Sequence, residues 1–273
     1  MVHIDGGAFV MGSGSQNDNP PHEVVLASFE MAEREITVGE FREFTDSEDI
    51  PFDWTSYDFM QHIRRRAGAT VPDSYAMYYI TWYEAVWYAN WRSHKDGLVP
   101  VYRFDEQDLR AYLYDYVEGM SPPRVVWDRS ASGYRLPTEA EWEFAATNRG
   151  LWTQHTDEEL LEVAWLRENA DFRVHSVRKR QPSQLGLYDV LGNVSEWCWD
   201  YYGSEYYSSS PLNDPTGPPR GTETPFFPGR RDIRVVRGCS WMASVSSCNP
   251  RARMLTIAAR RSIIGIRLVR NAE

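Results

Sequence analysis

The chain has 273 residues, of which 39 are acidic and 29 are Lys or Arg, so its formal net charge is −10. Proteins bind nucleic-acid phosphates and anionic membrane surfaces through clustered positive charge, and this composition therefore argues against both kinds of partner. No run approaches the roughly 18 apolar residues of a membrane-spanning helix, so we expect no transmembrane segment. The first residues lack the basic and apolar regions of a signal peptide.

Three helices are predicted by one local pattern, a Thr followed three residues later by a Glu, at 37–40, 81–84 and 138–141. In this capping box the Thr side chain binds the backbone N–H of the Glu, and the Glu carboxylate binds the backbone N–H of the Thr. Apolar residues at helical spacing follow each pattern. We expect Gly97 and Gly150 to end the second and third helices.

Strand-like runs are few and short, and they cover residues 9–11, 24–31, 234–237 and 264–269. Residues 201–231 hold six prolines, which predicts a long irregular loop. Loops of that length in a compact domain are usually functional or disordered. Because no repeat or linker divides the chain, we expect a single α+β domain over residues 1–273 with little regular secondary structure.

The common catalytic and metal-binding patterns are absent from the sequence. No two of the six histidines lie three to five residues apart, and there is neither a P-loop nor a G-x-S-x-G motif. The three cysteines form no C-x-x-C, so we expect neither a disulfide framework nor a cysteine-rich zinc site. Glu139, Glu141 and Glu143 lie at a predicted helix start, where capping and the helix dipole explain them better than acid–base chemistry.

One short segment has the character of a calcium site. Asn193 and Glu196 supply side-chain oxygens three residues apart in a predicted tight turn, and the carbonyl of Val194 lies between them. Carboxylate, amide and carbonyl oxygens are the ligands that Ca²⁺ takes. A hydrogen-bonded turn that holds Trp197 and Trp199 in place explains the same residues, and the pattern leaves both interpretations open.

Seven segments resemble, in family order, those of the formylglycine-generating-enzyme (sulfatase-modifying-factor) family. They read GGAFVMGS (6–13), EITVGEF (35–41), ITWYEA (80–85), GYRLPTEAEWE (133–143), GLYDVLGNVSEW (186–197), RGCSW (237–241) and GIRL (265–268). The resemblance covers nearly the whole chain. It implies a C-type-lectin-like fold of the α+β class, and it strengthens the interpretation of Asn193, Val194 and Glu196 as calcium ligands.

The resemblance does not extend to the catalytic residues of the family. In its oxidases two cysteines separated by four residues bind copper, and they follow the segment that reads RGCSW here. Cys248 matches the second of them, but Ala243 stands in place of the first. Since Cu(I) requires soft thiolate ligands, we expect no copper and no formylglycine-generating activity. We expect Cys248 to be a buried small hydrophobe, while an oxidase with an altered site at Cys248 and Cys239 stays as the alternative.

The segment 239–263 departs from its relatives in another way. Many relatives carry an Asn-rich sequence here, between flanking motifs that correspond to residues 237–241 and 264–267. This chain carries a mixture of Met, Ser, Val, Leu, Thr and Ile instead. That arrangement resembles the variable proteins of diversity-generating retroelements, in which a fixed lectin-like scaffold displays diversified residues. The implied ligand-binding residues are Met242, Ala243, Ser244, Ser246, Ser247, Asn249, Met254, Leu255, Thr256, Ile257, Ser262 and Ile263.

The hypothesis for function is therefore a non-catalytic protein that binds a protein or cell-surface ligand. The resemblance implies a location at the cell surface or outside the cell. A fixed regulatory or structural relative, in which the apolar residues of this segment belong to the core, is the remaining alternative. The binding hypothesis predicts that these side chains cluster on one exposed face, and burial of most of them would contradict it.

Overall fold

The computed structural model describes residues 1–14, 17–47, 71–105, 108, 109, 112, 120–151 and 156–272. The helices that it defines there are α1 (Val38–Thr45), α3 (Trp82–Lys95), α5 (Glu139–Ala146) and α6 (Asp157–Val163), with two short 3₁₀ turns, η2 (Tyr206–Ser208) and η3 (Val245–Ser247). All three predicted capping boxes are present, at Thr37, Thr81 and Thr138. A fourth, at Thr156, begins α6 and was not predicted.

The predicted helix ends were correct for α3 and wrong for α5. Helix α3 ends at Lys95, and Gly97 follows with a φ of +73°. Helix α5 ends earlier than expected, at Ala146. Asn148 and Arg149 already have left-handed φ values of 49° and 61°, and Gly150 only completes that turn.

The strands form small sheets. A four-stranded sheet has the order β10 (Ile264–Gly265), β7 (Ser195–Tyr201), β8 (Ile233–Arg237), β9 (Met254–Ile257), and only its β10–β7 pair is parallel. A three-stranded antiparallel sheet has the order β1 (Val2–Ile4), β4 (Phe29–Met31), β11 (Val269–Asn271). Two antiparallel pairs complete the set, β2 (Gly7–Met11) with β3 (His22–Leu26) and β5 (Tyr102–Arg103) with β6 (Val126–Trp127).

Some predicted strands required correction. Residues 24–31 are divided between β3 and β4, and residues 264–269 between β10 and β11, because each run changes its pairing partner. Apolar patterning shows a buried face but not a change of sheet. Strand β7 was not predicted, since its buried acidic residues interrupt the apolar pattern that marks a strand. Between β7 and β8 the chain is irregular apart from η2, as its proline content predicts.

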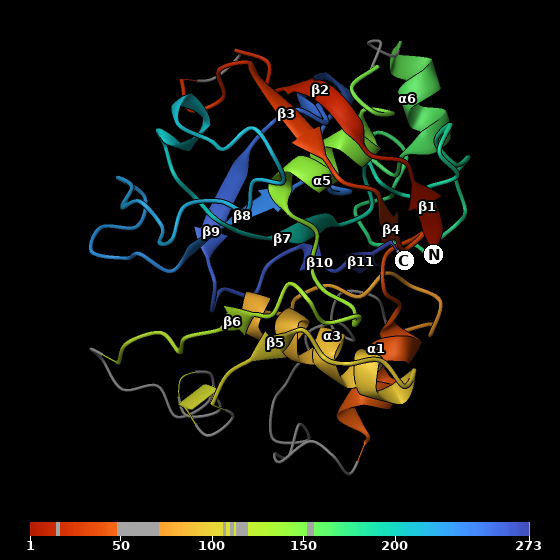
Figure 1. Cartoon of the computed structure of the whole chain (residues 1–273). Coiled ribbons are helices and arrows are strands. Elements are labelled where there is room, and N and C mark those ends of the chain that lie inside the picture. The colour runs from red at the N-terminus through yellow and green to blue at the C-terminus, as the bar shows by residue number, and fades with distance from the viewer. Residues whose placement is uncertain are drawn as a thin grey trace.

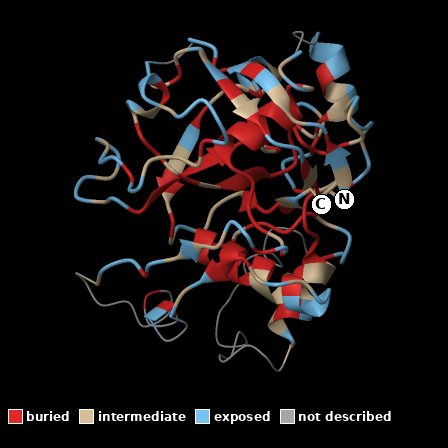
Figure 2. Cartoon of the chain, in the orientation of Figure 1, coloured by how far each residue is buried: buried red, intermediate tan, exposed pale blue. Residues whose placement is uncertain are grey.

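The four-stranded sheet lies at the centre of the molecule, with α1 and α3 on one side and α5 on the other (Figure 1). Figure 2 shows that buried residues concentrate in α3, α5 and strands β7 and β8. Trp82 and Trp197 are fully buried in one hydrophobic cluster, and Trp142 in the other. The mixed helix and strand content confirms the predicted α+β class. Residues 239–263 follow the central strand β8 directly and are therefore attached to the most buried part of the fold.

Candidate functional site

A disulfide closes the first part of segment 239–263. Cys239 and Cys248 are bonded, with their Cα atoms 5.5 Å apart. The expectation of no disulfide and of Cys248 as an isolated buried residue was therefore wrong. The chain leaves β8 through Gly238, whose φ of +79° suits glycine, and the 3₁₀ turn η3 then directs it back. That local reversal brings the two cysteines together, and their spacing alone does not reveal it.

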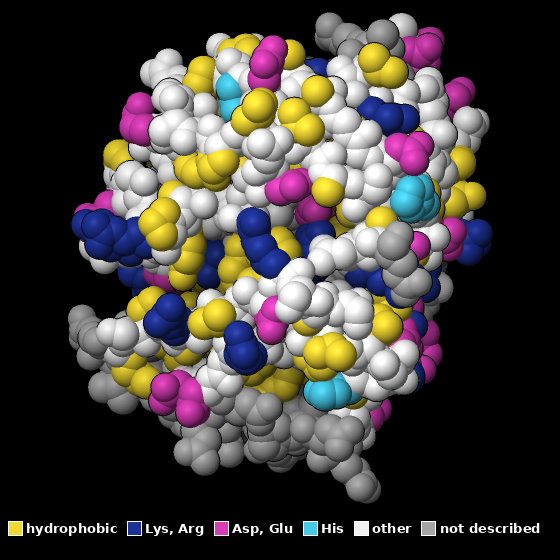
Figure 3. All heavy atoms as spheres, viewed as in Figure 1, with side chains coloured by type: hydrophobic (Ala, Val, Ile, Leu, Met, Phe, Trp, Pro, Cys, Tyr) yellow, Lys and Arg dark blue, Asp and Glu magenta, His cyan; other side chains and the backbone are white. Residues whose placement is uncertain are grey.

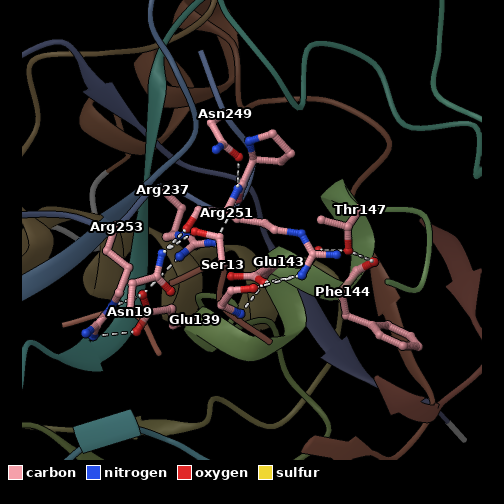
Figure 4. Close-up of polar contacts among 12 residues, drawn as sticks. Ser13, Asn19, Glu139, Glu143, Phe144, Thr147, Arg237, Asn249, Arg251 and Arg253 are labelled. Atoms are coloured by element: carbon pink, nitrogen blue, oxygen red, sulfur yellow. Dashed lines mark hydrogen bonds and ion pairs between the residues drawn. The ribbon is translucent and has the colours of Figure 1, made fainter. Parts of the chain in front are cut away.

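A buried network of arginines and glutamates fixes the next part (Figure 4). Arg237 donates to Glu139 at 3.1 Å and to Glu143 at 2.6 Å. Arg253 donates to both carboxylate oxygens of Glu139, at 2.8 and 2.9 Å. Arg251 lies 3.7 Å from Glu143. Sequence reasoning assigned these two glutamates to capping, whereas the structure uses them to hold two arginines of the C-terminal segment.

Glu141 behaves as predicted. Its backbone N–H donates to the Thr138 hydroxyl, and its carboxylate accepts from the Thr138 backbone N–H at 2.9 Å. It also accepts two 2.7 Å hydrogen bonds from Arg135, a bidentate partner that the capping pattern does not predict. Neighbouring glutamates on one helix thus serve two purposes, helix capping and attachment of a distant segment.

The backbone around the network is also fixed. Arg237 donates to the carbonyl of Pro250 at 2.7 Å, and the Asn19 side chain donates to the carbonyl of Arg251 at 2.8 Å. Arg251 in turn donates to the carbonyls of Val10 and Gly12, both at 2.9 Å. Residues 250 and 251 are therefore held by partners from β8, from β2 and the segment after it, and from α5.

The arginines set the protonation of the buried carboxyls. Burial alone would raise the pKa of Glu139, but Arg253 and Arg237 outweigh it and hold that pKa below its usual value. For Glu143 burial outweighs Arg237, so the pKa of that carboxyl lies above its usual value. Removing Arg253 or Arg237 therefore makes ionisation of the buried Glu139 carboxyl less favourable.

A third set of contacts holds the end of the segment. Strand β9 pairs with β8 from Met254 to Ile257. The carbonyl of Ala258 then accepts a 2.9 Å hydrogen bond from the backbone of Trp82, and Arg261 donates to Glu84 at 2.5 Å. The disulfide, the arginine network and this pairing together tie segment 239–263 to the core along its length.

The predicted ligand-binding residues differ in accessibility. Five are exposed: Met242 (51%), Ser246, Ser247, Asn249 and Met254 (37%). Six are half-buried: Ala243, Ser244, Leu255, Ile257, Ser262 and Ile263. Thr256 is buried, which corrects its assignment as a ligand-contacting residue, because it pairs in the sheet with the buried Arg234 of β8. Most of the set is accessible to solvent, although the residues lie in more than one place.

The residues of β9 face a hollow. Met254 and Leu255 line a space of ≈ 890 Å³, a volume within the range typical of ligand pockets. Another part of its lining comes from the irregular segment between β7 and β8, which contributes Tyr202, Phe226 and Phe227. Hydrophobic and basic side chains lie next to one another across the middle of the face that Figure 3 shows.

The residues around η3 lie elsewhere. The carbonyl of Ala243 accepts from the backbone of Arg167 at 2.9 Å, and the backbone of Val245 donates to the Glu168 carboxylate at 3.2 Å. Of the predicted ligand-binding residues, Met254 and Leu255 are the two that line the hollow in the part of the chain that the structure describes. Segment 239–263 thus presents side chains both beside α6 and at the hollow.

The side chain of Asn193 and the backbone N–H of Val194 are engaged with protein groups. The amide oxygen of Asn193 accepts from the backbone of His175 at 2.9 Å, and its amide nitrogen donates to Glu35 at 2.7 Å. The backbone of Val194 donates to the other oxygen of Glu35 at 3.1 Å. Burial, with Asp189 and Glu196 nearby, raises the pKa of Glu35 well above its usual value. These contacts describe the hydrogen-bonded turn that was the alternative interpretation.

Glu196 has cationic and N–H partners of its own. Its carboxylate accepts from Arg267 at 2.9 Å and from the indole nitrogen of Trp142 at 2.7 Å. A guanidinium bound to this carboxylate opposes a second cation at the same oxygens. Among the residues that the structure describes, no group of three or more His, Cys, Asp or Glu side chains could hold a metal ion. The side-chain oxygens of Asn193 and Glu196 thus already have protein partners, and calcium binding stays a prediction.

Comparisons with known proteins agree with the sequence resemblance. The family described as "Sulfatase-modifying factor enzyme 1-like domain" matches residues 1–272. The solved structure of Treponema denticola variable protein 1 superposes with a TM-score of 0.78 at 28% sequence identity, covering 100% of this chain and 95% of that one.

Proteins with different names are similar in sequence to this chain. The formylglycine-generating enzyme of Streptomyces coelicolor is 27% identical over 96% of this chain and 83% of its own length. The inactive Cα-formylglycine-generating enzyme 2 of Mus musculus is 27% identical over 94% of this chain and 79% of its own length. The serine/threonine-protein kinase Pkn1 of Chlamydia trachomatis is 28% identical, but the chain spans only 33% of it. Proteins named as active and as inactive thus share the domain.

Proposed function

The chain belongs to the sulfatase-modifying factor enzyme 1-like family, and from that premise we propose that it is a non-catalytic ligand-binding protein whose C-terminal segment is diversified. One observation carries the proposal. Met254 and Leu255 line a ligand-sized hollow, while Arg251 and Arg253 just before them are held to the buried face of α5. A rigid frame presents side chains to a ligand at low cost in ordering entropy.

The exposure of the segment fits a tolerance for sequence change. Substitutions at exposed positions away from specific contacts usually alter the free energy of unfolding by no more than about 0.5 kcal/mol. Met242 is such an exposed position. Ser246, Ser247 and Asn249 are also exposed, and their side chains form hydrogen bonds with Ser244 and Arg251 of the same segment. Diversity there leaves the fold intact, which is what a diversified receptor requires. The similarity to a protein named as variable supports the same conclusion.

We also propose that the protein works outside the reducing cytosol, at the cell surface or beyond it. The Cys239–Cys248 disulfide supports this location, because disulfides persist in oxidising compartments. In the described part of the chain, no helix combines the length and the apolar character needed to cross a membrane. The proposed ligand is a protein or another cell-surface molecule.

Sequencing the 3′ end of the gene and its flanks across a population of the source organism tests the proposal. We expect substitutions to concentrate at codons 242–263, to correspond to adenines in a nearby template repeat, and to spare residues 240, 241, 264 and 265. Those flanking anchors are the internal control. A uniform segment without a nearby template would contradict diversification and favour a fixed regulatory or structural relative.

The enzymatic alternative is favoured by one observation, the proximity of Cys239 and Cys248. Reduction would create two neighbouring thiols, and thiolates are the ligands that Cu(I) prefers. Because Ala243 stands where the family's oxidases carry a cysteine, we expect the reduced protein to bind no stoichiometric Cu(I) in an anaerobic titration. Stoichiometric Cu(I) that is lost in Cys248→Ser, and retained in the control Cys198→Ser, would support the oxidase and contradict the proposal.

A further inference from the structure

The hollow beside β9 has one wall that belongs to the proposed diversified segment and one that does not. Met254 and Leu255 form the first wall, and Tyr202, Phe226 and Phe227 form the second. We propose that the hollow binds a polypeptide segment in which an apolar side chain lies between an acidic and a basic residue. This inference rests on the proposed function and adds the chemistry of its ligand.

Phe226 is the apolar feature most available to a partner. Its side chain is 82% exposed, more than any other large hydrophobic side chain in the described residues. The neighbouring Phe227 donates its backbone N–H to Thr224 at 3.0 Å and packs against a hydrophobic cluster. Phe226 is therefore held outward by an anchored turn. Burying apolar surface gains about 25 cal/mol per Å², and aromatic residues, Phe among them, are enriched in protein interfaces.

The polar groups beneath the hollow are already satisfied. The Tyr202 hydroxyl donates to Asp18 at 2.6 Å. Arg253 donates to the carbonyls of Asp18 and Gly203, at 2.6 and 3.3 Å, as well as to Glu139. A ligand that enters between the aromatic wall and Met254 therefore meets apolar surface above satisfied polar groups. An apolar side chain fits this environment, whereas a polar one would lose its hydrogen bonds to water.

The rim of the hollow carries two charges of opposite sign. Arg260 and Glu205 both line it and are both exposed. Neither side chain makes an ion pair or a side-chain hydrogen bond with the residues that the structure describes. Each can therefore pair with a ligand group, Arg260 with a carboxylate and Glu205 with a cation. Such complementarity at a rim gives specificity and orients the partner.

The two charges favour a polypeptide over other ligands. A nucleic acid or an anionic lipid surface offers no cation to Glu205, and the net charge of −10 repels both. A neutral glycan offers neither charge. A polypeptide supplies both charges and an apolar side chain within a few residues of one another, so it matches the apolar walls and the rim together.

Selection from a phage-displayed library of random 12-residue peptides, with the full chain as bait, tests this inference. We expect enriched peptides to carry an aromatic or aliphatic residue flanked by an acidic residue on one side and a basic residue on the other. Phe226→Ala and Arg260→Glu should each weaken binding of an enriched peptide at least tenfold. Two matched controls should leave peptide binding unchanged. Phe172→Ala removes a residue that is 72% exposed and does not line the hollow. Arg220→Glu reverses an exposed charge in the segment that carries Phe226, at a position that does not line the hollow.

Charge reversal gives a sharper readout. When the Arg260→Glu variant is the bait, the selection should enrich peptides that carry a basic residue at the position where the wild-type protein selects an acidic one. No enrichment, enrichment without this charge order, or equal loss in the control variants would overturn the inference. Binding that depends on Met254 and Leu255 but not on Phe226 or Arg260 would also overturn it, and would leave the proposed function standing. A uniform gene segment combined with the expected peptides would instead contradict diversification alone.

Discussion

Replacing Arg253 with Met is expected to lower the free energy of unfolding at pH 7 by about 3 kcal/mol, the lower end of the range for breaking a buried ion pair. Arg253 and Glu139 are both buried, with a shortest N–O distance of 2.8 Å. Methionine fills much of the arginine volume but leaves Glu139 with Arg237 as its remaining charged partner. Because an unbalanced buried carboxylate is costly, the fold loses more than the hydrogen bonds themselves.

The loss should depend on pH in a defined direction. In the wild-type protein Arg253 and Arg237 outweigh burial and lower the pKa of Glu139 from its usual 4.5, so this group stabilises the fold above that pH. The contribution disappears as the pH falls through the lower folded value. In Arg253→Met the pKa of Glu139 rises, and the folded state accepts a proton more readily. The difference between the two proteins should therefore be largest at neutral pH and should narrow as the pH falls through the raised pKa of Glu139 in the variant.

Urea unfolding at a series of pH values measures this effect. The matched control is Arg260→Met, which removes an exposed arginine of the same segment and should change the free energy of unfolding by less than about 0.5 kcal/mol. If Arg253→Met is as stable as this control, or if its deficit does not change with pH, the arginine network does not stabilise the fold in the way described.

Removing the disulfide should produce the second large effect. For the Cys239→Ala/Cys248→Ala variant we expect the free energy of unfolding to fall by about 2.5–3 kcal/mol, from the loop-closure entropy of a bridge with this short spacing. The two cysteines are 9 residues apart in sequence. The bridge restricts the unfolded chain around residues 242–247, so its loss should also increase hydrogen exchange there.

A reductant provides the internal control for this variant. Dithiothreitol should lower the urea midpoint of the wild-type protein toward that of the double variant and should leave the double variant unchanged. Cys198 is free and buried and is present in both proteins, so any effect through it appears in both. Equal midpoints for the wild type and the variant without reductant would show that the bridge does not contribute to stability.

Local chemistry in the sequence determined where the helices begin. Thr37, Thr81 and Thr138 each cap a helix through a glutamate only three residues away, so the signal and the structure it produces share one turn of chain. The six prolines of residues 201–231 likewise predicted an irregular segment. The family resemblance also came from the sequence, because its motifs are contiguous strings of residues, and the family match over residues 1–272 confirms it.

Only the tertiary structure decided which residues build the candidate site. Glu139 meets Arg237 and Arg253 across separations of 98 and 114 residues, and no local pattern joins them. The same holds for the hollow, whose walls at Phe226 and Met254 come from two segments that the fold places side by side. Burial makes the ion pairs strong and orders the walls, and burial depends on how the whole chain packs. For this reason the sequence identified segment 239–263 as unusual, while only the fold showed which of its side chains are free to meet a ligand.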